Sequence, residues 1–204
     1  MPQTIPRSRR SLLPHHHTRS PPWNGPAPPK VDRDHSWLGT PKTTRARELA
    51  EHFETVWVPE YGREYTETSV GREAFFHYQW RDEEFLHIAH RQVLIEDQLA
   101  KTANRVLICD TDVLATCIWQ ERYMGHCSPE VARLANQRRY DLYLLTDCDI
   151  PFMQDGLRDG EHLRQWMTQR FRDELGRRQL PWTLVYGSHA QRLRQAIEAV
   201  EKLF

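Results

Sequence analysis

The chain has 204 residues, 39% of them hydrophobic, which suffices for one compact domain but not for two full ones. The formal net charge is 0, yet residues 1–47 hold nine of the 28 Lys/Arg and two of the 28 Asp/Glu, which leaves 19 and 26 for an acidic body. The sequence contains no signal-peptide core and no apolar run long enough to cross a bilayer, which argues against a membrane protein.

The first segment, residues 1–34, carries eight of the 13 prolines and no periodic apolar pattern. Such a segment cannot bury enough surface to offset the entropy of ordering, so we predict a disordered basic leader over 1–34 and one folded domain over 35–204. A mitochondrial transit peptide is the alternative for a basic, acid-poor leader, but the prolines oppose the amphipathic helix that it needs.

Helical spacing begins at Thr43, and residues 55–60 (TVWVPE) then indicate a short strand that ends in a carboxylate. Residues 82–104 follow as a long helix. Its predicted apolar face consists of Phe85, Ile88, Ala89, Gln92, Leu94, Ile95 and Leu99.

Three further apolar runs lie at 105–112, 140–149 and 181–187, and a last helix is expected over 189–204. Near-continuous apolar runs are typical of strands buried on both faces of a parallel sheet. The alternation of helices and strands predicts an α/β fold, a three-layer sandwich around a parallel sheet. Ligands of such sheets bind beyond the carboxyl ends of the strands, so the polar residues there are the candidates for function.

Lys42-Thr43-Thr44 precedes a helix and matches the end of the phosphate-binding motif G-x-x-x-x-G-K-[ST]. In that motif, backbone N–H groups surround the phosphates, while the lysine and the hydroxyl contact phosphate and magnesium. Ser36 and Pro41 stand at the two glycine positions, and a proline there removes an N–H donor. An ordinary helix start with threonine caps is the alternative interpretation.

Asp110 and Asp112 stand at the end of the run at 105–112, where a strand-end aspartate commonly orients magnesium. The alternative is that one of them caps the next helix. Arg158 lies in the connection after 140–149, and an arginine there could neutralise charge during phosphoryl transfer or simply occupy a solvated turn.

Five sequence blocks, in one order and spacing, carry a family resemblance: VPEYGREY, FLHIAHRQ, ICDTDVLAT, DLYLLTDCDIPFMQDGLRDG and PWTLVYGSHAQR. Together they resemble the ribosylnicotinamide kinase domain of the NadR family, a P-loop kinase-like ATPase group, over residues 42–204. The resemblance implies a P-loop NTPase-type sandwich. It also implies ATP- and Mg²⁺-dependent transfer of phosphate to the 5′-hydroxyl of nicotinamide riboside, in the synthesis of NAD.

The same resemblance implies roles for individual residues on the nucleotide side. Lys42, Thr43 and Thr44 correspond to the phosphate loop, with Thr43 and Asp110 as the magnesium ligands. Arg158 corresponds to the arginine of a lid, and Gly187 and Arg192 lie where related kinases hold the adenine.

On the substrate side, Glu60 is the candidate base, because a strand-end carboxylate can accept or orient the proton of a ribose hydroxyl. Tyr61, Arg63, Glu64 and Asp112 are the other predicted substrate residues. Tyr61 could lie against a cationic pyridinium ring, a contact worth roughly 0.5 to 2 kcal/mol. A core or capping role is the alternative for the tyrosine and both glutamates.

The family's first strand and glycine loop look degraded or missing, and agreement begins abruptly between Lys42 and Ala46. One hypothesis is that residues before about 45 were translated from a shifted frame or a misplaced start. If the chain is genuine as written, a catalytically impaired nucleotide-binding or regulatory remnant is the alternative function.

A nucleic-acid-binding role for the basic leader is a further alternative, although no helix-turn-helix pattern is present. The four cysteines lack C-x-x-C spacing, so we expect free thiols in a reducing cytoplasm. The sequence leaves the oligomeric state open.

Overall fold

Five parallel strands in the order β2-β3-β1-β4-β5 form the centre of the fold. The computed structural model describes residues 30–33, 42–70, 77–149 and 161–204. The strands are β1 (Lys30–Arg33), β2 (Trp57–Val58), β3 (Leu107–Cys109), β4 (Leu142–Thr146) and β5 (Trp182–Val185). The four strands predicted from the apolar runs are therefore confirmed.

Eight helical segments surround the sheet among the described residues. They are α1 (Lys42–His52), α2 (Tyr61–Tyr65), the π-helical turn η1 (Thr66–Val70), α3 (Asp82–Leu99), α4 (Val113–Met124), α5 (Pro129–Gln137), α6 (Glu161–Arg177) and α7 (His189–Glu201). No described helix combines the length and the apolar character that a bilayer-spanning segment needs.

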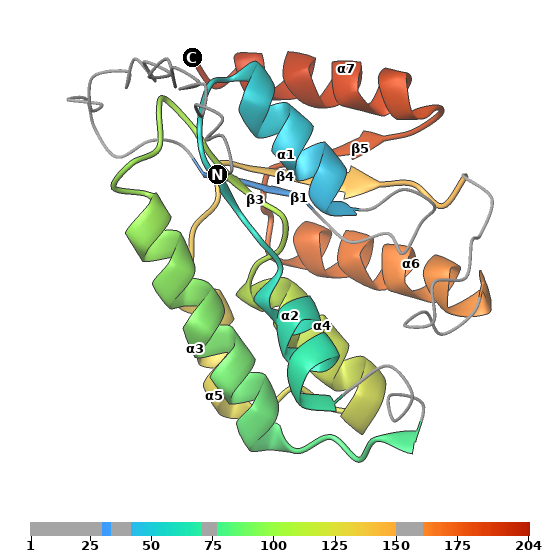
Figure 1. The fold of residues 1–204 in the computed structure, drawn as a ribbon. Coiled ribbons are helices and arrows are strands. Elements are labelled where there is room, and N and C mark those ends of the chain that lie inside the picture. Colours follow the sequence, from blue (N-terminus) through green and yellow to red (C-terminus); the bar gives the residue numbers. More distant parts are fainter. Residues whose placement is uncertain (1–29, 34–41, 71–76, 150–160) are drawn as a thin grey trace, which may run out of the picture.

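The helices form two layers, with α1 and α7 on one face of the sheet and α3, α4, α5 and α6 on the other (Figure 1). Side chains of successive strand residues point to opposite helix layers, because a strand has a two-residue period. In β3, for example, Ile108 packs beneath α1 and α7, whereas Leu107 and Cys109 pack against the other layer. The predicted three-layer α/β sandwich is confirmed.

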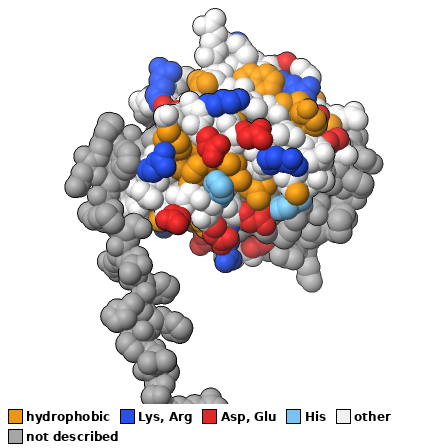
Figure 2. Space-filling view, turned by 90° about the horizontal axis from the view of Figure 1, so that it is seen from above, with side chains coloured by type: hydrophobic (Ala, Val, Ile, Leu, Met, Phe, Trp, Pro, Cys, Tyr) orange, Lys and Arg blue, Asp and Glu red, His pale blue; other side chains and the backbone are white. Residues whose placement is uncertain are grey.

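The outer surface of the α1 and α7 layer carries no single sign of charge. Figure 2 shows acidic, basic and apolar side chains interspersed over this face. Glu48 of α1 and His189 of α7, both half-buried, pair at 2.7 Å and so join the two helices.

The central strand is β1, which lies within the predicted leader, although the first strand of the family was predicted to be degraded or missing. It pairs with β3 on one side and β4 on the other, and Val31 is fully buried. The backbone N–H of Lys30 donates to Asp141 Oδ2 at 2.8 Å, and Lys30 Nζ lies 3.7 Å from the buried Glu96. Two neighbouring strands and these polar anchors hold a strand that has a single large aliphatic residue, so residues 30–33 are a correction to the predicted leader.

The buried face of α3 differs from the predicted apolar face at three positions: Glu84 and Glu96 are buried and Leu94 is not. Leu94 is 44% exposed, whereas Glu96 is fully buried. Glu96 accepts hydrogen bonds from Tyr140 Oη at 2.6 Å and Arg138 Nη2 at 2.8 Å. Glu96 can be buried because Tyr140 and Arg138, on a distant segment, satisfy its carboxylate. Helical periodicity alone does not indicate such partners.

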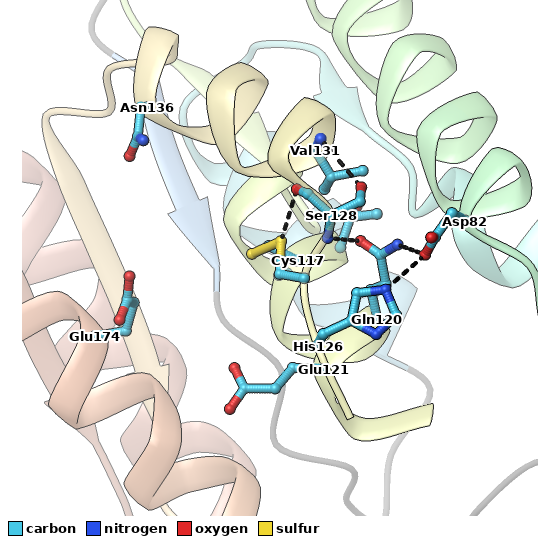
Figure 3. Close-up of a disulfide and its surroundings, with 12 residues drawn as sticks. Asp82, Cys117, Gln120, Glu121, His126, Ser128, Val131, Asn136 and Glu174 are labelled. Atoms are coloured by element: carbon cyan, nitrogen blue, oxygen red, sulfur yellow. Dashed lines mark hydrogen bonds and ion pairs between the residues drawn. A yellow bond between two sulfur atoms is a disulfide. The ribbon is translucent and has the colours of Figure 1, made fainter. Parts of the chain in front are cut away.

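Two of the four cysteines form a disulfide, which corrects the expectation of free thiols. Cys117 of α4 is bonded to Cys127, with Cα atoms 5.2 Å apart. Gly125 has φ 79° and ends α4, and this left-handed turn brings the chain back beside the helix. Next to the bond, Ser128 N–H donates to Gln120 Oε1 and Gln120 Nε2 donates to Asp82 (Figure 3). Cys109 and Cys148 are not part of a disulfide.

Glu174 of α6 is paired with three arginines, two of them on the same helix and one directly after it. Its carboxylate accepts hydrogen bonds from Arg177, Arg178 and Arg170, and Arg170 also donates to Glu121 of α4. Hydrogen bonding, first from Arg177 and then from Arg178 and Arg170, outweighs the effect of burial and lowers the pKa of Glu174 to about 2.

This pKa shift predicts a loss of stability in acid. Because the pKa falls from 4.5 in the unfolded chain to about 2 in the folded one, ionised Glu174 stabilises the fold above pH 4.5 and loses that effect as the pH falls toward 2. We expect the loss to be on the order of 2 to 3 kcal/mol. Urea unfolding at several pH values should show a shallower acid dependence for Glu174→Gln. The exposed Glu198→Gln should behave as the unmodified chain, and an unchanged slope in Glu174→Gln would contradict the assignment.

Candidate functional site

The carboxyl ends of β2 and β3 bring two sequence-predicted segments side by side. Val58 pairs with Cys109 in parallel register, and Asp110 N–H donates to Val58 O at 2.8 Å. The segments that continue from these strands, Pro59-Glu60 and Asp110-Thr111, therefore leave the sheet at the same edge. This is the edge at which parallel α/β sheets bind ligands.

Asp110 and Asp112 have different roles, although both are buried. Asp112 is the N-cap of α4, where its Oδ1 accepts from Ala115 N–H at 2.7 Å. Tyr143 of β4 donates its hydroxyl to Asp112 Oδ2 at 3.2 Å, and burial raises the pKa of Asp112 to about 7. The capping role therefore belongs to Asp112, which leaves Asp110, 3% exposed, as the carboxylate at the strand end.

The residues at this edge fit a magnesium ion that is shared with a phosphate ligand. Within the described ranges, no group of three His, Cys, Asp or Glu residues could hold a metal by itself. Magnesium in nucleotide sites commonly takes one or two carboxylates and completes its shell with water and phosphate oxygens. A hard carboxylate oxygen from Asp110 suits that arrangement.

Glu60 occupies the N-cap position of α2, but its side chain makes no capping hydrogen bond there. The side chain is half-buried. The first N–H of α2 is instead satisfied by Gln92 of α3, whose Oε1 accepts from Tyr61 N–H at 3.0 Å. The Glu60 carboxylate therefore does not cap α2, which was the alternative role predicted for it.

The other predicted substrate residues lie along α2. The Tyr61 hydroxyl lies 3.1 Å from His87 Nε2, and the Arg91 guanidinium lies 5.5 Å from the centroid of the Tyr61 ring. Arg63 pairs with Glu67 at 3.4 Å, and Glu64 is exposed. The ring of Tyr61 therefore already has a cation over it, and its contact with a pyridinium ring stays a prediction.

The ends of β4 and β5 are held together by a buried arginine. Arg192 of α7 is fully buried. It donates to Gly187 O at 2.8 Å and Asp147 O at 3.0 Å, and it forms a short ion pair with Asp149. Asp149 Oδ2 also accepts from Gly187 N–H at 2.6 Å. In this structure Arg192 holds the turn in place, and its predicted contact with adenine stays a prediction.

Gly187 has φ 83°, and a Cβ built on it would lie 2.5 Å from Gln191 Oε1. The left-handed backbone and this close approach explain why glycine stands at the turn.

The remaining predicted residues are described in part or not at all. Lys42, Thr43 and Thr44 form the start of α1, but their side chains lie outside the described part of the structure. Arg158 lies outside the described residues.

Two residues at the sheet edge were not identified from sequence: Gln92 and Asp149. Gln92 was recognisable as a polar residue in the apolar face of a helix. Asp149 stands at the end of the predicted run 140–149, but no local pattern indicated its pairing with Arg192, which lies 43 positions away.

Comparisons with known proteins agree with this architecture. A family model described as "AAA domain" matches residues 38–192. The "Trifunctional NAD biosynthesis/regulator protein NadR" of Salmonella typhimurium and that of Escherichia coli are each 33% identical over 117 residues. These matches cover 57% of this chain and 28% of each relative, so the chain corresponds to little more than a quarter of those proteins.

Two solved structures share the fold. The "NadR protein in complex with NAD and AMP-PNP" aligns with a TM-score of 0.68 at 19% identity, over 86% of this chain and 49% of that one. The "NadR protein in complex with NR" gives 0.68 at 20% identity, over 86% and 51%. The resemblance to the NadR family seen in the sequence is confirmed.

Proposed function

This chain belongs to the AAA domain family, and on that premise we propose that it binds Mg·ATP and transfers phosphate to the 5′-hydroxyl of nicotinamide riboside or a similar small riboside. The observation that carries the proposal is the juxtaposition of the Glu60 and Asp110 segments at the carboxyl edge of β2 and β3. Related NadR proteins have been solved with AMP-PNP and with NR, which supports this substrate class. A cytoplasmic location is part of the proposal.

Phosphoryl transfer makes two demands that this edge can meet. A carboxylate must orient or accept the proton of the attacking hydroxyl, and Glu60 is free of helix capping to do so. A second carboxylate must orient the metal, and Asp110 is the strand-end residue that does not cap α4. Bound magnesium would neutralise charge on the phosphates.

Other predicted residues complete the proposed site. Lys42, Thr43 and Thr44 would contact the phosphates, with Thr43 as a second metal ligand, and Arg158 would neutralise charge that develops during transfer. Gly187 and Arg192 would shape the adenine side. On the acceptor side, Tyr61, Arg63, Glu64 and Asp112 would surround the riboside.

A turnover assay tests the proposal against the impaired remnant. The chain and a variant with Ser36→Gly and Pro41→Gly are incubated with Mg·ATP and nicotinamide riboside, and formation of the mononucleotide is followed by chromatography. We expect turnover that Glu60→Gln lowers by about 10² to 10⁴-fold. Turnover only after the glycines are restored would identify a remnant. Absence of turnover from both chains, with every riboside tried, would overturn the proposed activity.

A further inference from the structure

A single side chain links the two segments that carry the proposed base and the proposed metal ligand. Gln92 lies on α3 and is 1% exposed. Its Oε1 accepts from Tyr61 N–H at 3.0 Å, and its Nε2 donates to Pro59 O at 3.3 Å and to Thr111 O at 3.0 Å. Both hydrogens and the oxygen of the carboxamide are thus directed at backbone groups of the sheet edge.

The bonds to Pro59 and Tyr61 lie on either side of Glu60. Because one carboxamide contacts the carbonyl before Glu60 and the N–H after it, the peptide units flanking this residue are fixed together. The bond to the Thr111 carbonyl fixes the residue that follows Asp110. Gln92 therefore fixes the backbone next to Glu60 relative to the backbone next to Asp110.

The two segments beyond the strand pairing need a side chain to connect them. The backbone hydrogen bond from Asp110 to Val58 lies at the end of the β2–β3 pairing. Beyond this hydrogen bond the two segments diverge: the one after β2 enters α2 and the one after β3 enters α4. A buried carboxamide with all three groups satisfied loses little to desolvation and is rigid. Gly62 brings α2 close to the same helix, since a Cβ there would lie 3.4 Å from Ile88.

We propose that Gln92 is a positioning residue for phosphoryl transfer, which sets the orientation of the Glu60 carboxylate relative to Asp110. The inference rests on the proposed function, because it assigns Gln92 a role through Glu60. Misplacement of a reacting group by about 1 Å can cost on the order of 10² in rate.

The test compares Gln92→Met, which keeps the volume but makes no hydrogen bonds, with Gln98→Met on the exposed side of the same helix. We expect Gln92→Met to lower kcat on the order of 10²-fold with KM for ATP unchanged, and Gln98→Met to have no effect. In a Glu60→Gln background, Gln92→Met should cause no further loss of kcat. Equal losses in both backgrounds, or an unchanged kcat, would overturn the proposal.

A second readout is independent of activity. Amide hydrogen exchange at Tyr61, followed by NMR, should accelerate at least 10-fold in Gln92→Met and stay unchanged in Gln98→Met, because Tyr61 N–H loses its acceptor. An unchanged Tyr61 exchange rate would refute the positioning contact, even if the unmodified chain proved inactive. If Glu60→Gln retained full activity while Tyr61 exchange accelerated in Gln92→Met, the proposed base would fail and the structural contact would stand.

Discussion

Asp110→Asn is expected to lower the rate of phosphoryl transfer strongly while leaving the fold intact. The substitution keeps the shape of a buried side chain at the end of β3 but removes the charge that would hold magnesium. A loss on the order of 10³-fold in kcat is expected when a preorganised charged contact to the transferred phosphate is removed. Steady-state kinetics with saturating Mg²⁺ measure the loss, and thermal unfolding checks the fold.

Two matched variants control this experiment. Asp112→Asn should lose less activity and remain folded, because asparagine caps a helix as well as aspartate does and Asp112 is the residue that caps α4. Asp173→Asn, at an exposed position of α6, should behave as the unmodified chain. If Asp112→Asn were inactive and Asp110→Asn active, the proposed metal-binding role would belong to Asp112 rather than to Asp110.

Asp149→Ala is expected to produce a large loss of stability. It removes the Asp149 carboxylate that pairs with the fully buried Arg192 guanidinium and that accepts from Gly187 N–H. Removing one member of a buried ion pair commonly costs about 3 to 5 kcal/mol. The side chain of Asp149 is 39% exposed, so water can replace part of the contact and we expect about 3 kcal/mol. Denaturation in urea measures the difference.

The double variant Asp149→Ala, Arg192→Met makes the physical cause testable. If the cost comes from an uncompensated buried charge, removing that charge as well should restore part of the lost stability. Arg194→Met, at an exposed position of the same helix, is the control and should change stability little. A double variant less stable than Asp149→Ala alone would show that Arg192 contributes mainly through packing and its hydrogen bonds to Gly187 O and Asp147 O.

Local sequence was sufficient for most of the sheet. The runs that became β3 and β4 are apolar at nearly every position because these strands are buried on both faces, a condition visible in the residues themselves. The same pattern located the strand ends, and with them Glu60, Asp110 and Asp112. Whether Asp110 or Asp112 capped the following helix could not be predicted, because the choice depends on the backbone direction after β3.

Sequence by itself therefore determined the parallel α/β class, the family and the edge where polar groups gather, because alternating burial is encoded residue by residue in side-chain polarity. Tertiary structure alone decided which residues meet across distance. It placed β1 at the centre of the sheet, joined Cys117 to Cys127, directed Gln92 to three backbone groups and buried Arg192 against Asp149. The partners in each case are brought together by packing of the whole chain, and no local pattern specifies a contact whose two halves lie on different elements.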